Sequence, residues 1–184
     1  TKLARHFVAD EPPPALVDRL AAVYLKSGGE LGEVYRALIG HDAAWHGEPA
    51  KLKTPEEFVV STARLLGAGE RLFERAAAAN AAGAVADNPA GPVFALGQRV
   101  MAAPSPAGWS DRAEDWLGPD AVWKRVEWAT RIAERAGRRI DARSLAADSL
   151  GPRLGAETAR QIERAADASQ ALALLLLAPE FQRR

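Results

Sequence analysis

The sequence predicts an all-α fold: an irregular or orthogonal bundle of about eight helices with a long loop rich in proline and tryptophan. The chain contains 40 Ala and 20 Leu, against only 11 Val, 4 Ile and 5 Thr. Alanine and leucine lose least on entering a helix, whereas β-branched residues favour strands. No stretch shows clean two-residue alternation bounded by turn residues, so we expect no sheet.

Length and charge limit the class of protein. The chain has 184 residues, enough for one compact domain, and its 24 basic and 24 acidic side chains leave no net charge. This balance argues against a general nucleic-acid binder and gives no support for a polybasic membrane anchor. The absence of cysteine excludes disulfides, thiol nucleophiles and thiolate metal sites. The longest apolar run, 171–179, is far shorter than the roughly 20 residues that span a bilayer.

The domain organisation is expected to be simple. We find no repeat of the length typical of a solenoid. We therefore expect a single helical domain over 1–184. Because the chain begins with Thr1 rather than Met, we expect this domain to be the C-terminal portion of a longer protein.

Three helices are expected in the first quarter of the chain. The first covers 1–8 and ends before Pro12–Pro14, which open the second helix because proline is tolerated in a first turn. An apolar stripe follows, and Gly28 and Gly29 close the second helix. The spacing of apolar residues predicts a third helix over 31–45.

The clearest helix start in the chain lies at residues 54–57, which read Thr-Pro-Glu-Glu. This order supplies an N-cap, a proline for the first helical position and a glutamate that completes a capping box. The pattern predicts a helix over 55–66. An Ala-rich helix over 70–83, with Leu72 and Phe73 as its larger core residues, and a short helix over 92–100 are expected next.

A long loop is expected over 101–118, where prolines and glycines interrupt the helical pattern. Long loops in compact domains are often ordered and functional. We expect this loop to fold back over the helix that begins at Pro55, and to present Trp109 to the core, where it would be largely buried.

Four further helices are expected after the loop. The strongest covers 120–138 and carries an apolar stripe at Val122, Val126, Ala129, Ala133 and Ala136. Shorter helices over 141–150 and 155–167 follow. The last helix, with Ser169 as its expected cap and Pro179 at its end, is apolar all round. We therefore place it, with the helix over 120–138, at the centre of the bundle.

The tryptophan-rich loop holds the first group of candidate binding residues. Trp109 and Trp116 could form an aromatic platform for a sugar ring or for an apolar residue of a partner, or could simply seat the loop on the core. Asp111 and Asp115 lie beside them. A carboxylate pair across a cleft would indicate glycoside hydrolysis, whereas carboxylates before a helix more often act as caps and solvated charges.

Two further groups carry weaker signals. Lys51, Lys53 and Arg64 flank the capped helix and could meet an anion, although solvated surface charge is the simpler interpretation. His41 and His46 lie near two acidic residues, but their spacing of five does not match the spacing of four that places both on one helix face. We interpret His41 as part of a helix C-terminus and predict no metal site and no cofactor.

Four blocks of the sequence carry a family resemblance. Residues 51–61, followed by Arg64, look like a Lys-x-Lys-x-Pro-x-Glu-Phe-Val signature, and 97–109 look like a Gly-Gln and Pro-x-Pro-x-Gly-Trp segment. The opening 6–14 and the closing 177–183 are similar to the flanking blocks of the same family. Together the blocks resemble the C-terminal part of the bacterial domain-of-unknown-function family 1800. The resemblance implies an exported protein of the periplasm or cell envelope, and it implies no activity, cofactor or catalytic residue.

Two functions are consistent with these observations. The first is a non-enzymatic binding or scaffold domain of an exported bacterial protein, which contacts a protein partner or an envelope polymer through the tryptophan-rich loop. The second is a hydrolase of a polysaccharide or ester whose catalytic groups lie partly in a missing N-terminal region. An open groove with two convergent carboxylates near Trp109 or Trp116 would favour the hydrolase, and a closed, well-packed loop would favour binding.

Overall fold

The computed structural model describes residues 1–45, 47–68 and 90–184. Within these ranges it contains ten α-helices and no β-strand, which confirms the predicted all-α class. The chain groups into two compact units. Unit 1 comprises Thr1–Leu52, Asp111–Ala113 and Arg184, and unit 2 comprises Lys53–Ser110 and Glu114–Arg183. The single domain expected over 1–184 stays a prediction.

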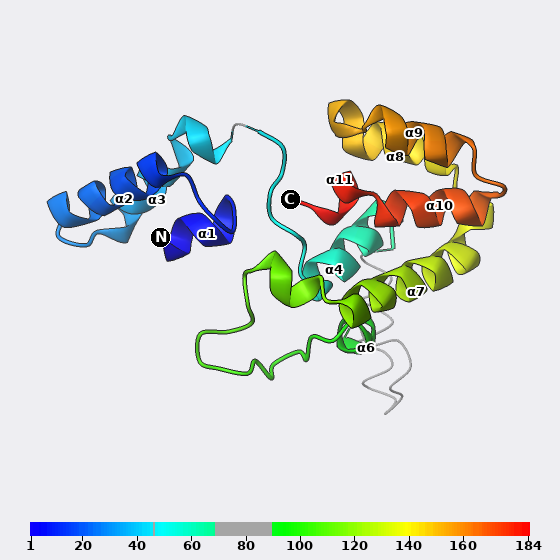
Figure 1. The fold of residues 1–184 in the computed structure, drawn as a ribbon, viewed down its shortest axis with the longest axis horizontal. Coiled ribbons are helices and arrows are strands. Elements are labelled where there is room, and N and C mark those ends of the chain that lie inside the picture. The colour runs from blue at the N-terminus through cyan, green and yellow to red at the C-terminus, as the bar shows by residue number, and fades with distance from the viewer. Residues whose placement is uncertain (46, 69–89) are drawn as a thin grey trace. The chain divides into compact units, whose positions relative to one another are not determined.

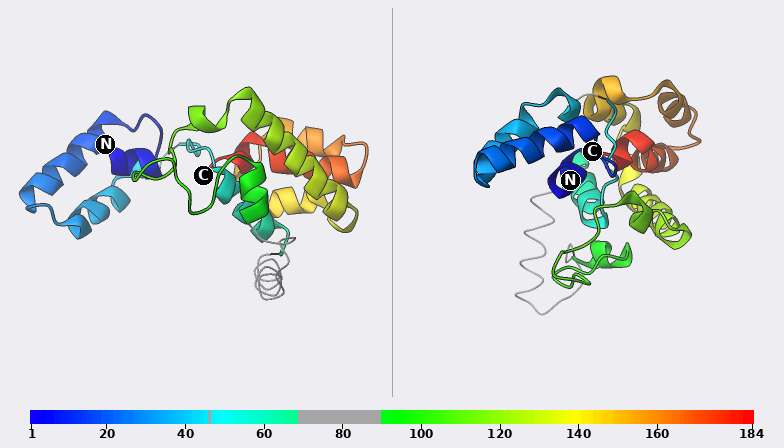
Figure 2. Two further views of the ribbon diagram at one scale, coloured as in Figure 1. Left: turned by 90° about the horizontal axis from the view of Figure 1, so that it is seen from below. Right: turned by 60° about the vertical axis from the view of Figure 1, so that its left-hand side comes forward.

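Unit 1 is built from three short helices and a 3₁₀ turn. These elements are α1 (Lys2–Phe7), α2 (Pro14–Lys26), α3 (Leu31–Ile39) and η1 (Asp42–Ala44). The helices α2 and α3 pack side by side, as Figures 1 and 2 show. Their shared core is small and contains Ala4, Leu16, Leu20, Val34 and Leu38.

The third helix is shorter than predicted. It ends at Ile39 with Gly40 as its C-cap, and the chain then re-enters a 3₁₀ turn at Asp42. His41 therefore does not lie at the end of a long helix; its Nδ1 accepts a hydrogen bond from the amide of Ala43 at 3.2 Å and caps η1. The apolar spacing continues through this break, because Ala44 of η1 packs against the same core as Val34 and Leu38 of α3. The sequence pattern therefore does not reveal where α3 ends.

Unit 2 contains the remaining helices. They are α4 (Pro55–Leu65), α6 (Ala90–Ala95), α7 (Pro119–Ala136), α8 (Ala142–Leu150), α9 (Ala156–Glu163), α10 (Ala168–Leu177) and α11 (Pro179–Gln182). Short 3₁₀ turns also occur at η3 (Gly137–Arg139) and η4 (Gly151–Arg153). The turn η2 (Ala113–Trp116) begins at the last residue of the unit 1 segment Asp111–Ala113. The capping box at the start of α4 is present as predicted, with the hydroxyl of Thr54 accepting from Glu57 and the carboxylate of Glu57 accepting from Thr54.

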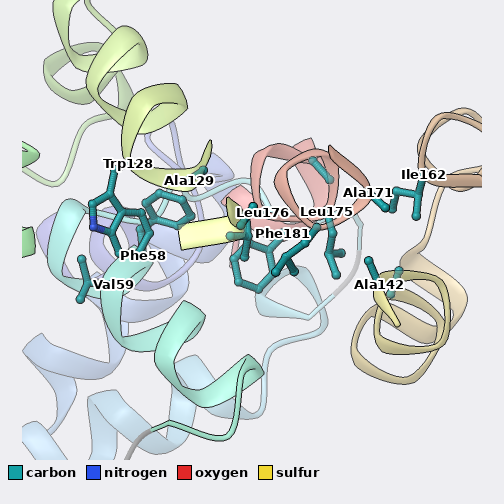
Figure 3. Close-up of a cluster of buried hydrophobic side chains, with 14 of the residues drawn as sticks. Phe58, Val59, Trp128, Ala129, Ala142, Ile162, Ala171, Leu175, Leu176 and Phe181 are labelled. Atoms are coloured by element: carbon teal, nitrogen blue, oxygen red, sulfur yellow. The ribbon is translucent and has the colours of Figure 1, made fainter. Parts of the chain in front are cut away.

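The helix α10 lies at the centre of unit 2, as its all-apolar sequence predicts. It packs against α7, α8 and α9, and its Leu172, Leu175 and Leu176 are fully buried. Figure 3 shows how the aromatic side chains of three helices meet around this centre. The ring of Phe58 makes edge contacts with Trp128, at 5.0 Å between centroids, and with Phe181, at 6.2 Å. Within unit 2 the central position predicted for α10 is thus confirmed, and α7 packs against it while its opposite face stays exposed.

Several local predictions for unit 2 are wrong. The cap of α10 is Asp167, whose carboxylate accepts from the amide of Gln170 at 2.7 Å, rather than Ser169. On α7, Val122 is exposed, while Arg125 and Trp128 are buried. The predicted apolar stripe therefore holds at Ala129 and Ala133, which are buried, and fails at Val122. Arg125 and Trp128 complete the inner face of the helix.

Other boundaries also shift. The short helix predicted over 92–100 begins earlier and ends at Ala95, because Gly97 adopts a left-handed φ of 95°. A final helix, α11, follows Pro179, where the sequence pattern predicts only an end. The Ala-rich helix predicted over 70–83 lies outside the described residues. No helix in the described ranges combines the length and the hydropathy needed to cross a bilayer.

Close packing at Gly137 generates a stability prediction. A Cβ added there would lie 2.6 Å from the Cα of Ser169, so η3 and the start of α10 can approach only with glycine. We expect Gly137→Ala to lower the free energy of unfolding by about 1–3 kcal/mol, measured by urea denaturation, because the backbone has to move apart. Gly91→Ala is the control, since a Cβ at Gly91 meets nothing within 4 Å; an equal loss in both variants would contradict this account.

Candidate functional site

In the tryptophan loop, which we define as residues 99–116, the indole groups of both tryptophans donate hydrogen bonds to backbone carbonyls of the same loop. The Nε1 of Trp109 donates to the carbonyl of Arg99 at 3.1 Å, and the Nε1 of Trp116 donates to the carbonyl of Ser110 at 3.0 Å. The two rings lie 5.7 Å apart and are tilted by 49°. Both indole N–H groups are thus bonded to backbone, which fits the interpretation that the tryptophans seat the loop.

The burial of the two tryptophans differs. Trp116 is only 6% exposed, and Trp109 has an intermediate exposure. Both rings are thus more covered than exposed, as predicted for Trp109, which is the less buried of the two. Gln98, at the base of the loop, accepts a hydrogen bond from the amide of Glu56 in the first turn of α4 at 2.9 Å. That the loop itself folds back over α4 stays a prediction.

The carboxylate of Asp115 serves the loop as well. It is exposed and accepts a hydrogen bond from the hydroxyl of Ser110. This bond joins the two ends of the segment 110–115, directly before Trp116. Asp115 is therefore held by a neighbouring side chain of the same loop.

Asp111 belongs to a different cluster, in unit 1, around a buried lysine. The side chain of Lys51 is 1% exposed, and its Nζ donates to the carboxylate of Asp10 and to the carbonyl of Asp111. The other carboxylate oxygen of Asp10 accepts from the amide of Ala113 at 2.7 Å. One buried ion pair thus fixes the segment Asp111–Ala113 within unit 1.

Ionisation of Asp10 supports this arrangement. Burial alone would raise the pKa of Asp10, but the hydrogen bonds from Lys51 and from the Ala113 amide outweigh it. The positive charges of Lys51 and Arg112 act in the same direction, so the pKa of Asp10 lies below its ordinary value of 3.8. Asp10 is therefore charged at neutral pH and remains a full partner for the ammonium group.

The carboxylate of Asp111 faces a histidine that sequence reasoning missed. Its Oδ1 lies 2.7 Å from the Nδ1 of His6, and both side chains are partly exposed. The guanidinium of Arg184 approaches the carbonyl of His6 at 3.4 Å. The backbone of Arg184 also exchanges two hydrogen bonds with Lys51, at 2.9 and 3.3 Å. The residues of this cluster come from distant parts of the chain, and for that reason no local motif could reveal them.

Lys53 lies in a third cluster, in unit 2. Its Nζ donates to the carbonyl of Phe181 at 2.6 Å and sits 4.1 Å from the centroid of the Phe181 ring. Burial, together with the positive charge of Arg153, lowers the pKa of Lys53 from 10.5 to about 8, although Glu57 opposes the shift. The carbonyl and the ring of Phe181 thus hold the ammonium group of Lys53.

The centre of this third cluster is Arg125 of α7, which the sequence analysis did not single out. It is 5% exposed, and its guanidinium donates to the Oε1 of Gln182 at 2.7 Å and to the carbonyl of Lys53 at 2.6 Å. It also lies 5.3 Å from the centroid of the Phe58 ring. Burial lowers the pKa of Arg125 to about 10, and the opposing charge of Glu57 raises it. The group stays protonated at neutral pH.

The predicted site residues fall in three groups. Within unit 2, Trp109, Trp116 and Asp115 share the tryptophan loop, and Lys53 belongs to the Arg125 cluster. Within unit 1, Asp111 belongs to the Lys51 cluster.

Solvated surface charge was the simpler interpretation of the basic residues around α4. That interpretation holds for Arg64, which is exposed, but it is wrong for Lys51, which is buried. His46 lies outside the described residues. In the part of the chain that the structure describes, no group of three or more His, Asp or Glu side chains could hold a metal ion.

Arg125 provides a direct test of the third cluster. We expect Arg125→Ala to lower the free energy of unfolding by about 3–5 kcal/mol, because it removes two hydrogen bonds and leaves buried acceptors without a donor. Arg125→Lys should recover only part of this loss, since an ammonium cannot fork to two acceptors in one plane. Arg131→Ala, at an exposed position of the same helix, should change stability by less than about 0.5 kcal/mol in the same urea titration.

Asp10 provides a pH-dependent test of the Lys51 cluster. Folding lowers the pKa of Asp10 below 3.8, so the charged carboxylate stabilises the fold at pH values above 3.8. This stabilisation is lost as the pH falls through the pKa that Asp10 has in the folded chain. We expect Asp10→Asn to lower the free energy of unfolding by about 1–3 kcal/mol at pH 7, as measured by urea denaturation. The same measurement at lower pH should give a smaller loss as the pH falls through the folded-state pKa of Asp10. A difference between wild type and variant that stays constant with pH would contradict the charged pairing.

The comparisons with known proteins give one match. A family model described as "Protein of unknown function (DUF1800)" matches residues 1–183. No curated protein and no solved structure matches the chain. The family resemblance found in the four sequence blocks is therefore confirmed over essentially the whole chain.

Proposed function

The chain belongs to the DUF1800 family of proteins of unknown function, and we propose that it is a non-enzymatic binding domain of an exported bacterial protein. Its partner, in this proposal, is another protein, which it contacts through the tryptophan loop. The support comes from the way that the loop is anchored and from the side chains that it leaves exposed.

The observation that carries the proposal is the exposed stretch 101–107. All seven residues are exposed, none is charged, and two of them are prolines. Met101 is fully exposed and adopts a left-handed φ of 59°, which is uncommon for a residue other than glycine. Backbone strain of this kind persists only where the surroundings impose it, and it is frequent at binding sites.

Exposed apolar side chains extend this surface. Val100 is 48% exposed, and Phe94, at the end of α6, is 60% exposed. Methionine and phenylalanine are enriched at protein interfaces, and uncharged proline-rich segments are recognised by aromatic grooves of protein partners. The bonded indoles of Trp109 and Trp116 hold the ends of the loop, so the partner would meet a pre-organised surface. An envelope polysaccharide is a weaker fit, because a sugar platform needs open ring faces, and of the two indoles Trp116 is buried and Trp109 is only partly exposed.

A hydrolase remains the second candidate because of the pair formed by His6 and Asp111. A carboxylate 2.7 Å from an imidazole nitrogen is the arrangement that orients a general base in ester hydrolysis. The two loop carboxylates, however, bond to different partners, His6 for Asp111 and Ser110 for Asp115. Hydrolysis of p-nitrophenyl acetate that disappears in His6→Gln would favour this candidate over the binding domain.

The binding proposal is tested with the double variant Val100→Ser, Met101→Ser. Both positions are exposed, so we expect the fold to be retained and at least one envelope protein, captured by the wild type and then purified, to bind at least tenfold more weakly. Val122→Ser, at an exposed position of α7, is the matched control and should bind as the wild type does.

Two results would overturn the proposal. One is equal affinity of the double variant and the wild type for every captured protein. The other is pelleting of the wild type with purified peptidoglycan, together with loss of that pelleting in the double variant, because this would identify an envelope polymer as the partner. Export is tested separately, by locating the full-length protein in cell fractions.

A further inference from the structure

Lys53 carries an amine that the proposed function does not use. The residue lies in unit 2, directly before the N-cap of α4, and it is partly buried. Its Nζ lies 4.1 Å from the centroid of the Phe181 ring and donates to the carbonyl of Phe181 at 2.6 Å. A neutral amine has two hydrogens and a lone pair, so it can keep this bond and still offer an electron pair to an electrophile.

The backbone of Lys53 is bonded on both sides. Its amide donates to the carbonyl of Gln182 at 2.8 Å, and its carbonyl accepts from the guanidinium of Arg125 at 2.6 Å. Gln182 and Arg125 are themselves buried, at 8% and 5% exposure. The base of the Lys53 side chain is therefore fixed on the core of unit 2, and the amine stays among the same neighbouring charges.

The neighbouring charges leave the Lys53 amine in a net positive potential. Arg153, in η4, and Glu57, in the first turn of α4, act on the amine with opposite signs, and the effect of Arg153 is the larger. Burial and this potential together lower the pKa of Lys53 to about 8. At pH 7 about one amine in ten is then neutral and nucleophilic, against about one in three thousand at the ordinary pKa of 10.5.

A positive potential also favours one kind of product. The charge of Arg153 disfavours an ammonium group and stabilises a negatively charged group at the same place. Acylation by a carboxylic acid derivative would leave a neutral amide, which gains nothing from Arg153. Addition of carbon dioxide leaves a carbamate anion, which does gain. Carbon dioxide is also small and uncharged, so it reaches a partly buried amine without the cost of desolvating a charge.

We propose that Lys53 is a carbon dioxide site, at which the side-chain amine is converted to a carbamate. The ammonium form first releases one proton to water. The lone pair of the neutral amine then attacks the carbon atom, so that a C–N bond forms and one C=O electron pair moves to oxygen. The nitrogen releases a second proton, and the product is an N–H group that carries a carboxylate. This N–H remains a donor for the carbonyl of Phe181, while Arg153 stabilises the new negative charge.

The proposal is tested with the intact chain in carbon-13 bicarbonate buffer at about pH 8, where about half of the Lys53 amines are neutral. Carbamates are trapped by ethylation with triethyloxonium and are located by mass spectrometry of peptides. We expect a trapped yield at Lys53 at least about tenfold higher than at Lys26, an exposed lysine of α2. Peptide mapping separates this product from that of the α-amino group of Thr1, which also reacts with carbon dioxide.

A variant of Arg153 tests the role of its charge. Arg153 is exposed, so Arg153→Gln should keep the fold, and we expect the trapped yield at Lys53 to fall at least about threefold. Arg164→Gln is the matched control, since Arg164 is also exposed and does not act on the Lys53 amine. Circular dichroism establishes that both variants are folded.

Three results would overturn the proposal. The first is the absence of a trapped carbamate at Lys53, even where acetic anhydride acetylates this amine ahead of Lys26, because Lys53 would then be a reactive amine without affinity for carbon dioxide. The second is an equal yield at Lys53 and Lys26. The third is an equal yield at Lys53 in Arg153→Gln and Arg164→Gln, because the charge of Arg153 would then have no part in the reaction.

Discussion

The fold of unit 2 depends on one buried guanidinium. Arg125 of α7 donates to the side chain of Gln182 in α11 and to the backbone of Lys53 just before α4. The amide of Gln182 continues the chain of bonds to the carbonyl of Leu176 in α10. The guanidinium is planar, stays charged after burial and can donate to two acceptors at once, so one side chain joins these elements. Burying the charge costs free energy that is offset only when both acceptors are in place. The packing of α7 therefore depends on α11 and on the start of α4 together.

Unit 1 uses the same principle with a lysine. The ammonium of Lys51 is enclosed by the carboxylate of Asp10 and the carbonyl of Asp111. In both units, then, the buried charged groups have protein partners and are committed to holding distant segments of the chain. Within the described residues, these buried charged groups therefore explain how each unit holds its own segments together.

Sequence reasoning predicted what depends on neighbours along the chain. The capping box at Thr54, the all-apolar helix α10 and the all-α class all follow from local propensity and spacing, and the structure has each of them. Contacts between residues far apart in the sequence could not be predicted in this way. The local sequence gives Lys51 the pattern of a charged surface residue before a helix, whereas its partner Asp10 lies 41 positions earlier in the chain.

The site was predictable in its aromatic part and not in its polar part. Trp109 and Trp116 attract notice because tryptophan is rare and large, and they do meet. Their rings lie together because each indole N–H finds a backbone carbonyl within the same loop, a local solution that leaves the stretch 101–107 free of secondary structure yet held at both ends. Since that stretch carries no charge, a partner of the kind we propose would recognise it by shape and by the release of water from apolar surface. Under that proposal the exposed side chains of Val100 and Met101 would carry the specificity, and the tryptophans would hold the loop that presents them.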